Sequence, residues 1–362
     1  MKKQLLLKAN GSYEELDQYL TARGIQKPLA VCDGSFQYLS IRHFFEGKKN
    51  VVYFSDFQPN PLYESVVRGV QVFQENKCDA IIAVGGGSAM DVAKCIKLYQ
   101  NMDPAENYLK QEIVPNDIPL AAVPTTAGTG SEATRYAVIY CEGQKQSVTH
   151  ESCIPDMVLF DASALKTLPL YQKKATMLDA LCHSIESYWS VNSTDESREY
   201  SRQAIALILS NMNGYLASDD TAGWEMLKAA NLAGRAINIT QTTAGHAMCY
   251  KITSLYNTAH GHSAALVLRK LWPYMKAHPE NCADARGEAY LRSVFAELDE
   301  LFGGDGPERF SRIFDSLELE VPEAGEEDIQ ILAASVNQVR LKNNPVRLDE
   351  ETAAQLYREI LR

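Results

Sequence analysis

The prediction of a parallel α/β sheet starts from one stretch, Ile81-Ile82-Ala83-Val84-Gly85-Gly86-Gly87-Ser88-Ala89-Met90-Asp91-Val92-Ala93-Lys94. An apolar run of strand length enters three glycines, and a helical pattern follows. Glycines let backbone N–H groups approach a ligand closely, and a helix N-terminus attracts phosphate. We therefore expect Gly86, Gly87 and Ser88 to cradle a pyrophosphate. The alternative is a tight strand–helix turn without a ligand, because the turn is neither a G-x-G-x-x-G nor a Walker A loop.

The same alternation of short apolar runs and helical patterns continues through the first half of the chain. Such alternation is typical of a parallel sheet with helices on both faces. The expected strands are Pro28–Cys32, Asn50–Phe54, Ala80–Val84, Leu120–Val123, Ala137–Tyr140 and Met157–Phe160, and the helices between them include Pro61–Asn76 and Ala89–Tyr99.

From about Asp161 onward, apolar residues recur only at helical spacing. The expected helices are Ala175–Ser190, Ser197–Ala217, Trp224–Ile239 and Ala264–His278. A chain of 362 residues is long enough for two cores. We predict an α/β dinucleotide-binding domain over residues 1–163 and an all-helical domain over residues 164–362.

A second polar loop, Pro124–Glu132, follows the strand expected at Leu120–Val123. Its hydroxyl groups could hold a ribose or another part of a dinucleotide. Alone, the loop is more typical of a capped helix start with Thr129 or Ser131 as the N-cap. Two such loops at successive strand ends favour a nucleotide crevice. The residues expected to contribute are Thr125, Thr126, Thr129 and Ser131.

Asp33 follows the strand expected at Pro28–Cys32 and precedes Gly34. A carboxylate at the end of an early strand can accept hydrogen bonds from the adenosine ribose and repels the 2′-phosphate of NADP. Asp33 therefore favours NAD(H) over NADP(H). An ordinary Asp-Gly turn explains the same two residues equally well.

The second half contains a set of metal-ligand types. Asp179 and His183 are four residues apart in a helical pattern, so both side chains lie on one face. His246 and His260 lie in polar clusters further along the chain. One carboxylate and three imidazoles suit Fe(II), Zn(II) or a similar ion. From the spacing alone, a hydrogen-bonded histidine in the core is a commoner explanation of each His than a metal ligand is.

Composition narrows the class of protein. A net charge of −11 argues against a nucleic-acid-binding surface or an anionic membrane surface. The N-terminus has too short an apolar run for a signal peptide, and no stretch has the length of a membrane span. We therefore expect a cytoplasmic protein with no nucleic-acid or membrane partner.

Together these motifs resemble the iron-dependent, group III alcohol dehydrogenases over nearly the whole chain. Gly85–Lys94 and Pro124–Glu132 look like the two cofactor motifs of that family. The resemblance places the metal ligands on Asp179, His183, His246 and His260, with Fe(II) foremost and Zn(II) or Ni(II) compatible. It implies cofactor contacts at Asp91 and Lys145, an N-terminal α/β domain, a helical C-terminal domain and a homodimer.

One position departs from the family pattern. Many members have a histidine four residues after the third ligand, where this chain has Tyr250 followed by Lys251. Tyr250 or a water chain would then relay the proton. The surrounding stretch, His246–Tyr256, looks like the phosphonoacetaldehyde reductase branch. A dianionic substrate needs cations, for which Lys251 and Arg135 are candidates, although an ordinary ion pair is equally compatible with both.

The sequence therefore predicts a metal-dependent, NAD(P)H-linked interconversion of an aldehyde and a primary alcohol. Phosphonoacetaldehyde is the best single substrate prediction. Alternatives are another small alcohol such as a diol, hydroxybutyrate, butanol or glycerol, a dehydroquinate-synthase-like lyase of the same fold, and a non-enzymatic nucleotide-binding protein.

Overall fold

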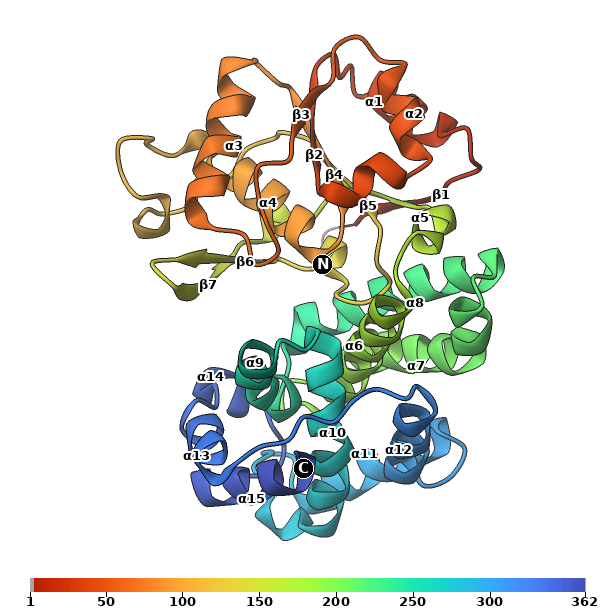
Figure 1. The fold of residues 1–362 in the computed structure, drawn as a ribbon, viewed down its shortest axis with the longest axis vertical. Helices are drawn as coiled ribbons and strands as arrows, with labels where there is room; N and C mark the ends of the chain where they lie inside the picture. The colour runs from red at the N-terminus through yellow and green to blue at the C-terminus, as the bar shows by residue number, and fades with distance from the viewer. Residues whose placement is uncertain (1–2, 362) are drawn as a thin grey trace. The chain divides into compact units, whose positions relative to one another are not determined.

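The structure, a computed structural model, describes residues 3–361 (Figure 1). The chain forms two compact units. One extends to Pro169 and also includes Ala217–Asn231, and the other comprises Leu170–Leu216 and the chain from Leu232 onward. The domain boundary expected at 163/164 falls inside a short helix, α5 (Ala162–Lys166). The return of Ala217–Asn231 to the first unit is not part of the expected two-domain division.

The first unit is built on a six-stranded sheet of order β1-β8-β5-β4-β2-β3. All of its strand pairs are parallel, as the alternating pattern predicts. The edge strand β1 was not expected, because its apolar run is short and mostly exposed. The strands are β1 (Leu5–Lys8), β2 (Pro28–Cys32), β3 (Val52–Phe54), β4 (Ala80–Gly85), β5 (Leu120–Pro124) and β8 (Met157–Phe160).

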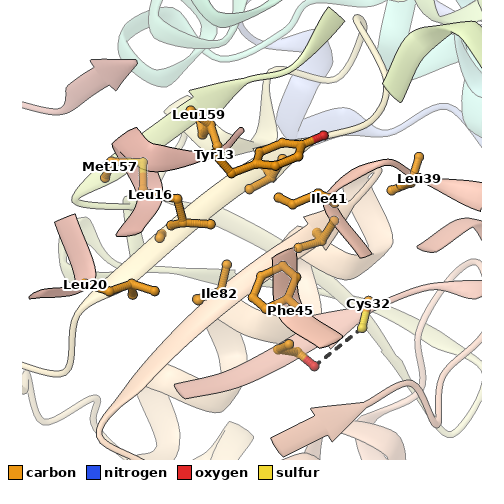
Figure 2. Packing of buried hydrophobic residues seen from close by; sticks show 14 of the residues in the cluster. Tyr13, Leu16, Leu20, Cys32, Leu39, Ile41, Phe45, Ile82, Met157 and Leu159 are labelled. Carbon is orange, nitrogen blue, oxygen red and sulfur yellow. Dashed lines mark hydrogen bonds between the residues drawn. The ribbon is translucent and has the colours of Figure 1, made fainter. Parts of the chain in front are cut away.

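Helices cover both faces of this sheet (Figure 1). Strands β2, β4 and β5 are buried along their whole length, which requires cover on both sides. Figure 2 shows one buried cluster of the core, where α1 (Glu14–Ala22) and α2 (Ile41–Glu46) bring Leu16 and Phe45 to Ile82 of β4. Helices α3 (Tyr63–Glu75) and α4 (Gly87–Leu98) pack together, and α4 also contacts β4, β5 and β2.

One expected strand does not join the parallel sheet. The run predicted at Ala137–Tyr140 forms β6 (Tyr136–Cys141), which pairs antiparallel with β7 (Gln144–Thr149) in a separate two-stranded sheet. Glu142 and Gly143 connect the strands with φ of 51° and 72°. Positive φ at both central residues is the signature of a type I′ hairpin turn, which reverses the chain at once. β7 was missed because its sequence is polar and largely exposed.

The second unit is helical, as the 3.6-residue periodicity predicts. Every residue of α6 (Leu170–Trp189) from Met177 to Trp189 is buried, so this helix is surrounded by the others. Helices α7 (Asp195–Leu216), α9 (Ala244–Tyr256) and α10 (His260–Ala277) pack around it or one another. The remaining helices are α11 (Glu288–Leu301), α12 (Gly306–Ser316), α13 (Glu326–Ala334), α14 (Gln338–Leu341) and α15 (Glu350–Ile360), together with the part of α8 (Asp220–Thr240) that follows Asn231.

None of the helices described between residues 3 and 361 combines the length and apolar character that crossing a lipid bilayer requires.

Candidate metal and cofactor sites

Two of the expected ligands lie on one face of α6. The Asp179 and His183 side chains are one helical turn apart, and the distance from Asp179 Oδ1 to His183 Nε2 is 3.9 Å. Both residues are buried, at 2% and 6% exposed. The i, i+4 spacing therefore brings a carboxylate and an imidazole together, as the sequence predicts.

The third expected ligand, His246, comes from the first turns of α9. Its Nε2 lies 3.4 Å from Asp179 Oδ1, and its ring stacks on that of His183 with a centroid distance of 4.5 Å. Two ligand atoms about 2.1 Å from one ion at tetrahedral angles lie roughly 3.4 Å apart. The spacing of Asp179 and His246 thus suits a shared first-row ion.

His260 is the first residue of α10, and its ring centroid lies 5.2 Å from that of His246. One ligand atom from each of Asp179, His246 and His260 lies within 4.8 Å of the other two. Three of the four expected ligands therefore lie together, and His183 lies beside them through the 3.9 Å approach of its Nε2 to Asp179 Oδ1. The donor set of one oxygen and several imidazole nitrogens fits a single Fe(II), Zn(II) or Ni(II) ion.

Glu186 supports His246 from behind. Its side chain is fully buried, and Oε2 is hydrogen bonded to Nδ1 of His246. Oε1 accepts hydrogen bonds from the Thr243 N–H at 2.9 Å, the Thr243 hydroxyl at 2.8 Å and the His246 N–H at 3.2 Å. With Nδ1–H directed to Glu186, Nε2 is the nitrogen of His246 that is left to bind an ion beside Asp179. Glu186 lies three residues after His183 in the sequence, and the sequence alone predicted no role for it.

The charges around His246 favour a cation. Burial raises the pKa of the Asp179 carboxyl, but the neighbouring imidazoles, His183 foremost, outweigh it and hold this pKa below its usual range. Burial lowers the pKa of His246, but Glu186 and Asp179 raise it to about 9. Two buried carboxylates thus flank an imidazole that readily holds positive charge. A divalent ion at Nε2 would take the place of that proton.

Two glycines let the helices approach closely enough to form the cluster. A Cβ on Gly261 would lie 2.1 Å from the Ala175 carbonyl oxygen and 2.5 Å from Asp179 Cβ. A Cβ on Gly245 would lie 2.9 Å from Glu186 Cδ. Both contacts are too short for any side chain, and the first involves rigid backbone. The glycines next to His246 and His260 therefore allow α9 and α10 to reach α6.

Of the expected catalytic residues, Tyr250 lies at this cluster. Its ring is parallel to that of His260, with an interplanar angle of 6° and a centroid distance of 5.6 Å. Burial raises the pKa of the Tyr250 phenol to about 12, so the hydroxyl stays protonated at neutral pH. Lys251 follows it on α9 and is partly buried. Arg135 belongs to the other unit, where its guanidinium donates to the Glu151 carboxylate at 2.8 Å.

The expected cofactor residues gather at the carboxyl ends of β2, β4 and β5. Gly85 ends β4 with φ of 156°, and a Cβ there would lie 2.6 Å from Asp33 Oδ2. Asp33 also accepts a hydrogen bond from Ser35 N–H at 2.9 Å. Gly86 is the N-cap of α4, so the helix N-terminus starts at the triple-glycine turn, as predicted.

The loop Pro124–Glu132, the threonine loop, lies directly against the glycine turn Gly85–Gly87. The Cβ position of Gly86 is 3.4 Å from Thr126 Cγ2, and that of Gly87 is 3.3 Å from Thr129 Cγ2. Gly86, Gly87 and Thr126 are each partly exposed. Backbone N–H groups of a helix N-terminus and threonine hydroxyls thus border the same edge of the sheet, an arrangement suited to a pyrophosphate.

Other expected cofactor residues occupy different surroundings. Ser88 is partly exposed in the first turn of α4, whereas Thr125 is buried and donates its N–H to the Gly85 carbonyl at 3.1 Å. Asp91 accepts a hydrogen bond from the Ser131 hydroxyl at 3.0 Å, so these two side chains contact each other. Lys145 is exposed on β7, and its charge favours the ionised form of Asp91.

Comparison with known proteins gives the same family over both units. A model described as iron-containing alcohol dehydrogenase matches residues 5–162, and one described as Fe-containing alcohol dehydrogenase family, C-terminal, matches residues 173–361. The phosphonoacetaldehyde reductase of Streptomyces viridochromogenes is 32% identical over 314 residues, covering 82% of this chain and 80% of that protein.

One further relative and one solved structure are also similar to this chain, the second of them in fold. The 1,3-propanediol dehydrogenase of Citrobacter freundii is 33% identical over 73% of this chain and 69% of that protein. The crystal structure of sulfoacetaldehyde reductase from Bifidobacterium kashiwanohense in complex with NAD+ has a TM-score of 0.86 at 24% identity, covering 99% of this chain and 97% of that one. This chain belongs to the iron-containing alcohol dehydrogenase family and is an oxidoreductase of the alcohol dehydrogenase and aldehyde reductase class.

Proposed function

We propose that the protein binds one divalent metal ion through Asp179, His183, His246 and His260 and reduces an aldehyde to a primary alcohol with a nicotinamide cofactor. The observation that carries this proposal is the convergence of the Asp179 carboxylate with the His246 and His260 imidazoles. The buried Glu186 carboxylate behind His246 is typical of a metal-ligating histidine rather than of an isolated core histidine.

The bound ion would supply Lewis-acid polarisation of the substrate oxygen. Three of the four proposed ligands, Asp179, His183 and His246, are almost fully buried, which would limit the access of water to the ion. Fe(II) is the proposed ion from the family, and the same ligands accept Zn(II) or Ni(II).

The glycine turn and the threonine loop are the proposed cofactor site. Gly86, Gly87 and Ser88 would bind the pyrophosphate at the N-terminus of α4, with Thr125, Thr126, Thr129 and Ser131 on the facing loop. Asp33, at the end of β2, would accept hydrogen bonds from the adenosine ribose and repel a 2′-phosphate. We therefore propose NAD(H) as the preferred cofactor.

Tyr250 is the proposed proton donor to the alkoxide formed by hydride transfer. Its ring stacks on that of His260, and its phenol remains protonated at neutral pH. A protonated hydroxyl beside the ligand cluster is suited to general acid catalysis. The alternative proton donor is a chain of water molecules. A Tyr250→Phe variant distinguishes the two, because it removes only the phenol hydroxyl.

Phosphonoacetaldehyde is the proposed substrate. The support is the identity to the phosphonoacetaldehyde reductase over 82% of this chain, together with a lysine, Lys251, next to Tyr250. Arg135 is already paired with Glu151, which makes Lys251 the stronger candidate for binding a phosphonate. The comparable identity to a 1,3-propanediol dehydrogenase supports a small neutral alcohol as the second candidate.

The test uses the full chain, stripped of metal and then restored with Fe(II), Zn(II) or no ion. NADH and NADPH oxidation is followed with phosphonoacetaldehyde and with propionaldehyde as the uncharged control. We expect turnover only with metal, a preference for NADH, and a higher kcat/KM for phosphonoacetaldehyde. Lys251→Ala should lower kcat/KM for phosphonoacetaldehyde alone. Metal-independent turnover would refute the metal role, and a preference for the neutral aldehyde would refute the substrate.

A further inference from the structure

Lys94 is a fully buried lysine on α4, one turn after Asp91. Its ammonium donates to the Ser131 carbonyl at 2.5 Å and to the Tyr136 carbonyl at 2.7 Å. The hydroxyl oxygens of Ser131 and Thr134 lie 3.1 Å and 3.2 Å away. An ammonium has three N–H groups, so four oxygens at these distances saturate it. Its charge is therefore held inside the first unit.

The acceptors of Lys94 all belong to one continuous segment. Ser131 lies near the end of the threonine loop, and Thr134 and Tyr136 lead from it into the β6–β7 hairpin. Lys94 itself lies on the helix that starts at the glycine turn. The buried Lys94 ammonium therefore joins α4, which begins at the proposed phosphate site, to the C-terminal end of the threonine loop.

The same contacts involve two residues expected to touch the cofactor. The Ser131 hydroxyl, which lies near the Lys94 ammonium, donates to Asp91 at 3.0 Å. The positive charge of Lys145 on β7 lowers the pKa of Asp91. The loop and the hairpin are thus attached to α4 through a polar network centred on Lys94.

We propose that Lys94 is a positioning residue for the cofactor: it holds the threonine loop at the spacing from the glycine turn that a dinucleotide requires. The inference rests on the proposed function, because it assumes that the dinucleotide binds between these two segments. A loop that is ordered before binding does not have to be ordered by the ligand, which improves affinity without any direct contact. Loss of Lys94 should therefore weaken cofactor binding more than it slows the chemical step.

The chain contains a matched control on the same helix. Lys97 is also buried, at 3% exposed, and donates to the Ile118 carbonyl at 2.5 Å and to the Asn116 carbonyl at 3.1 Å. These acceptors precede β5, whereas those of Lys94 follow it. Removing Lys97 therefore removes a similar buried ammonium at the other end of the strand, away from the threonine loop.

The experiment compares Lys94→Met with Lys97→Met in the full chain. The Kd for NADH is measured by nicotinamide fluorescence, with and without metal, alongside Tm and kcat at saturating NADH. We expect both variants to lose stability, but only Lys94→Met to raise Kd, by about tenfold, with kcat within about twofold of the wild type. A normal Kd in Lys94→Met, or an equal rise in Lys97→Met, would overturn the inference.

A milder variant keeps the inference testable if Lys94→Met does not fold. Thr134→Val removes one hydroxyl acceptor of Lys94 and conserves the side-chain shape. We expect it to raise the Kd for NADH about threefold, and an unchanged Kd overturns the inference. If the wild-type protein itself fails to bind NADH, the proposed function fails, and this inference fails with it.

Discussion

Replacing Glu186 by glutamine changes one oxygen to an amino group and should reverse the tautomer of His246. Oε1 of Glu186 accepts three hydrogen bonds, two from Thr243 and one from the His246 N–H. These three donors keep the amide oxygen of glutamine at that position. The amino group must then face Nδ1 of His246, where Oε2 now lies. Because an amino group only donates, Nδ1 has to become the acceptor.

The consequence for the metal follows directly. With Nδ1 as the acceptor, the imidazole proton moves to Nε2, the atom that faces Asp179 at 3.4 Å. An ion that displaces that proton would leave Nδ1–H facing the amide N–H of the glutamine, two donors in contact, whereas in the wild type Nδ1–H faces the Glu186 carboxylate. Removing such a supporting partner lowers metal affinity about 10- to 100-fold, or roughly 1.4 to 2.7 kcal/mol. Competition against a chromogenic chelator measures the affinity, and metal analysis of the purified protein gives the stoichiometry.

Thr243→Val is the matched control for Glu186→Gln. It removes one hydrogen bond to Oε1 and the acceptor of the Trp189 indole N–H, but leaves the contact between Glu186 and His246 intact. We expect it to lower the free energy of unfolding by about 1–3 kcal/mol and to leave metal affinity nearly unchanged. Metal affinity in Glu186→Gln equal to that of the wild type would refute the assigned role of Glu186.

Four further outcomes are expected. Gly261→Ala should lower metal affinity and should lower the free energy of unfolding by about 1–3 kcal/mol, because the added Cβ would lie 2.1 Å from a backbone oxygen. Gly325→Ala is the control: its Cβ has no neighbour within 4 Å, so stability and metal affinity should stay unchanged. Removal of metal should lower Tm, and a restored ion at about 100 times its Kd should return roughly 2.7 kcal/mol. Tyr250→Phe keeps the ring on His260 but should lower kcat about 100-fold, and an unchanged kcat would favour a water relay. Burial raises the pKa of Asp91 from 3.8 to about 6, so the free energy of unfolding should fall as the pH rises from about 4 to 6. Urea unfolding at several pH values measures this dependence, which Asp91→Asn should lack.

Much of the fold was visible in the sequence because it depends on local patterns. Short apolar runs predicted β2, β3, β4, β5 and β8, and helical periodicity predicted α6, α7, α8 and α10. Where the pattern was weak, the prediction failed. β1 and β7 are polar or exposed strands, and the antiparallel pairing of β6 depends on a turn at Glu142-Gly143 that was not recognised.

The metal cluster combines both kinds of information. Asp179 and His183 could be paired from the sequence alone, because the pitch of a helix fixes residues i and i+4 on one face. No local rule relates them to His246 and His260, which come from other helices. Only their packing, permitted by the absence of a side chain at Gly245 and Gly261, brings those imidazoles to Asp179.

The sequence by itself thus determined the class of the sheet, the helical second half and the residue types that could bind an ion. The tertiary structure decided which carboxylate orients His246, how Lys94 joins the two proposed cofactor loops, and that Ala217–Asn231 belongs to the first unit. The physical reason is range: backbone periodicity acts over one or two turns, whereas a buried hydrogen bond or a close helix contact joins residues that can be a hundred positions apart.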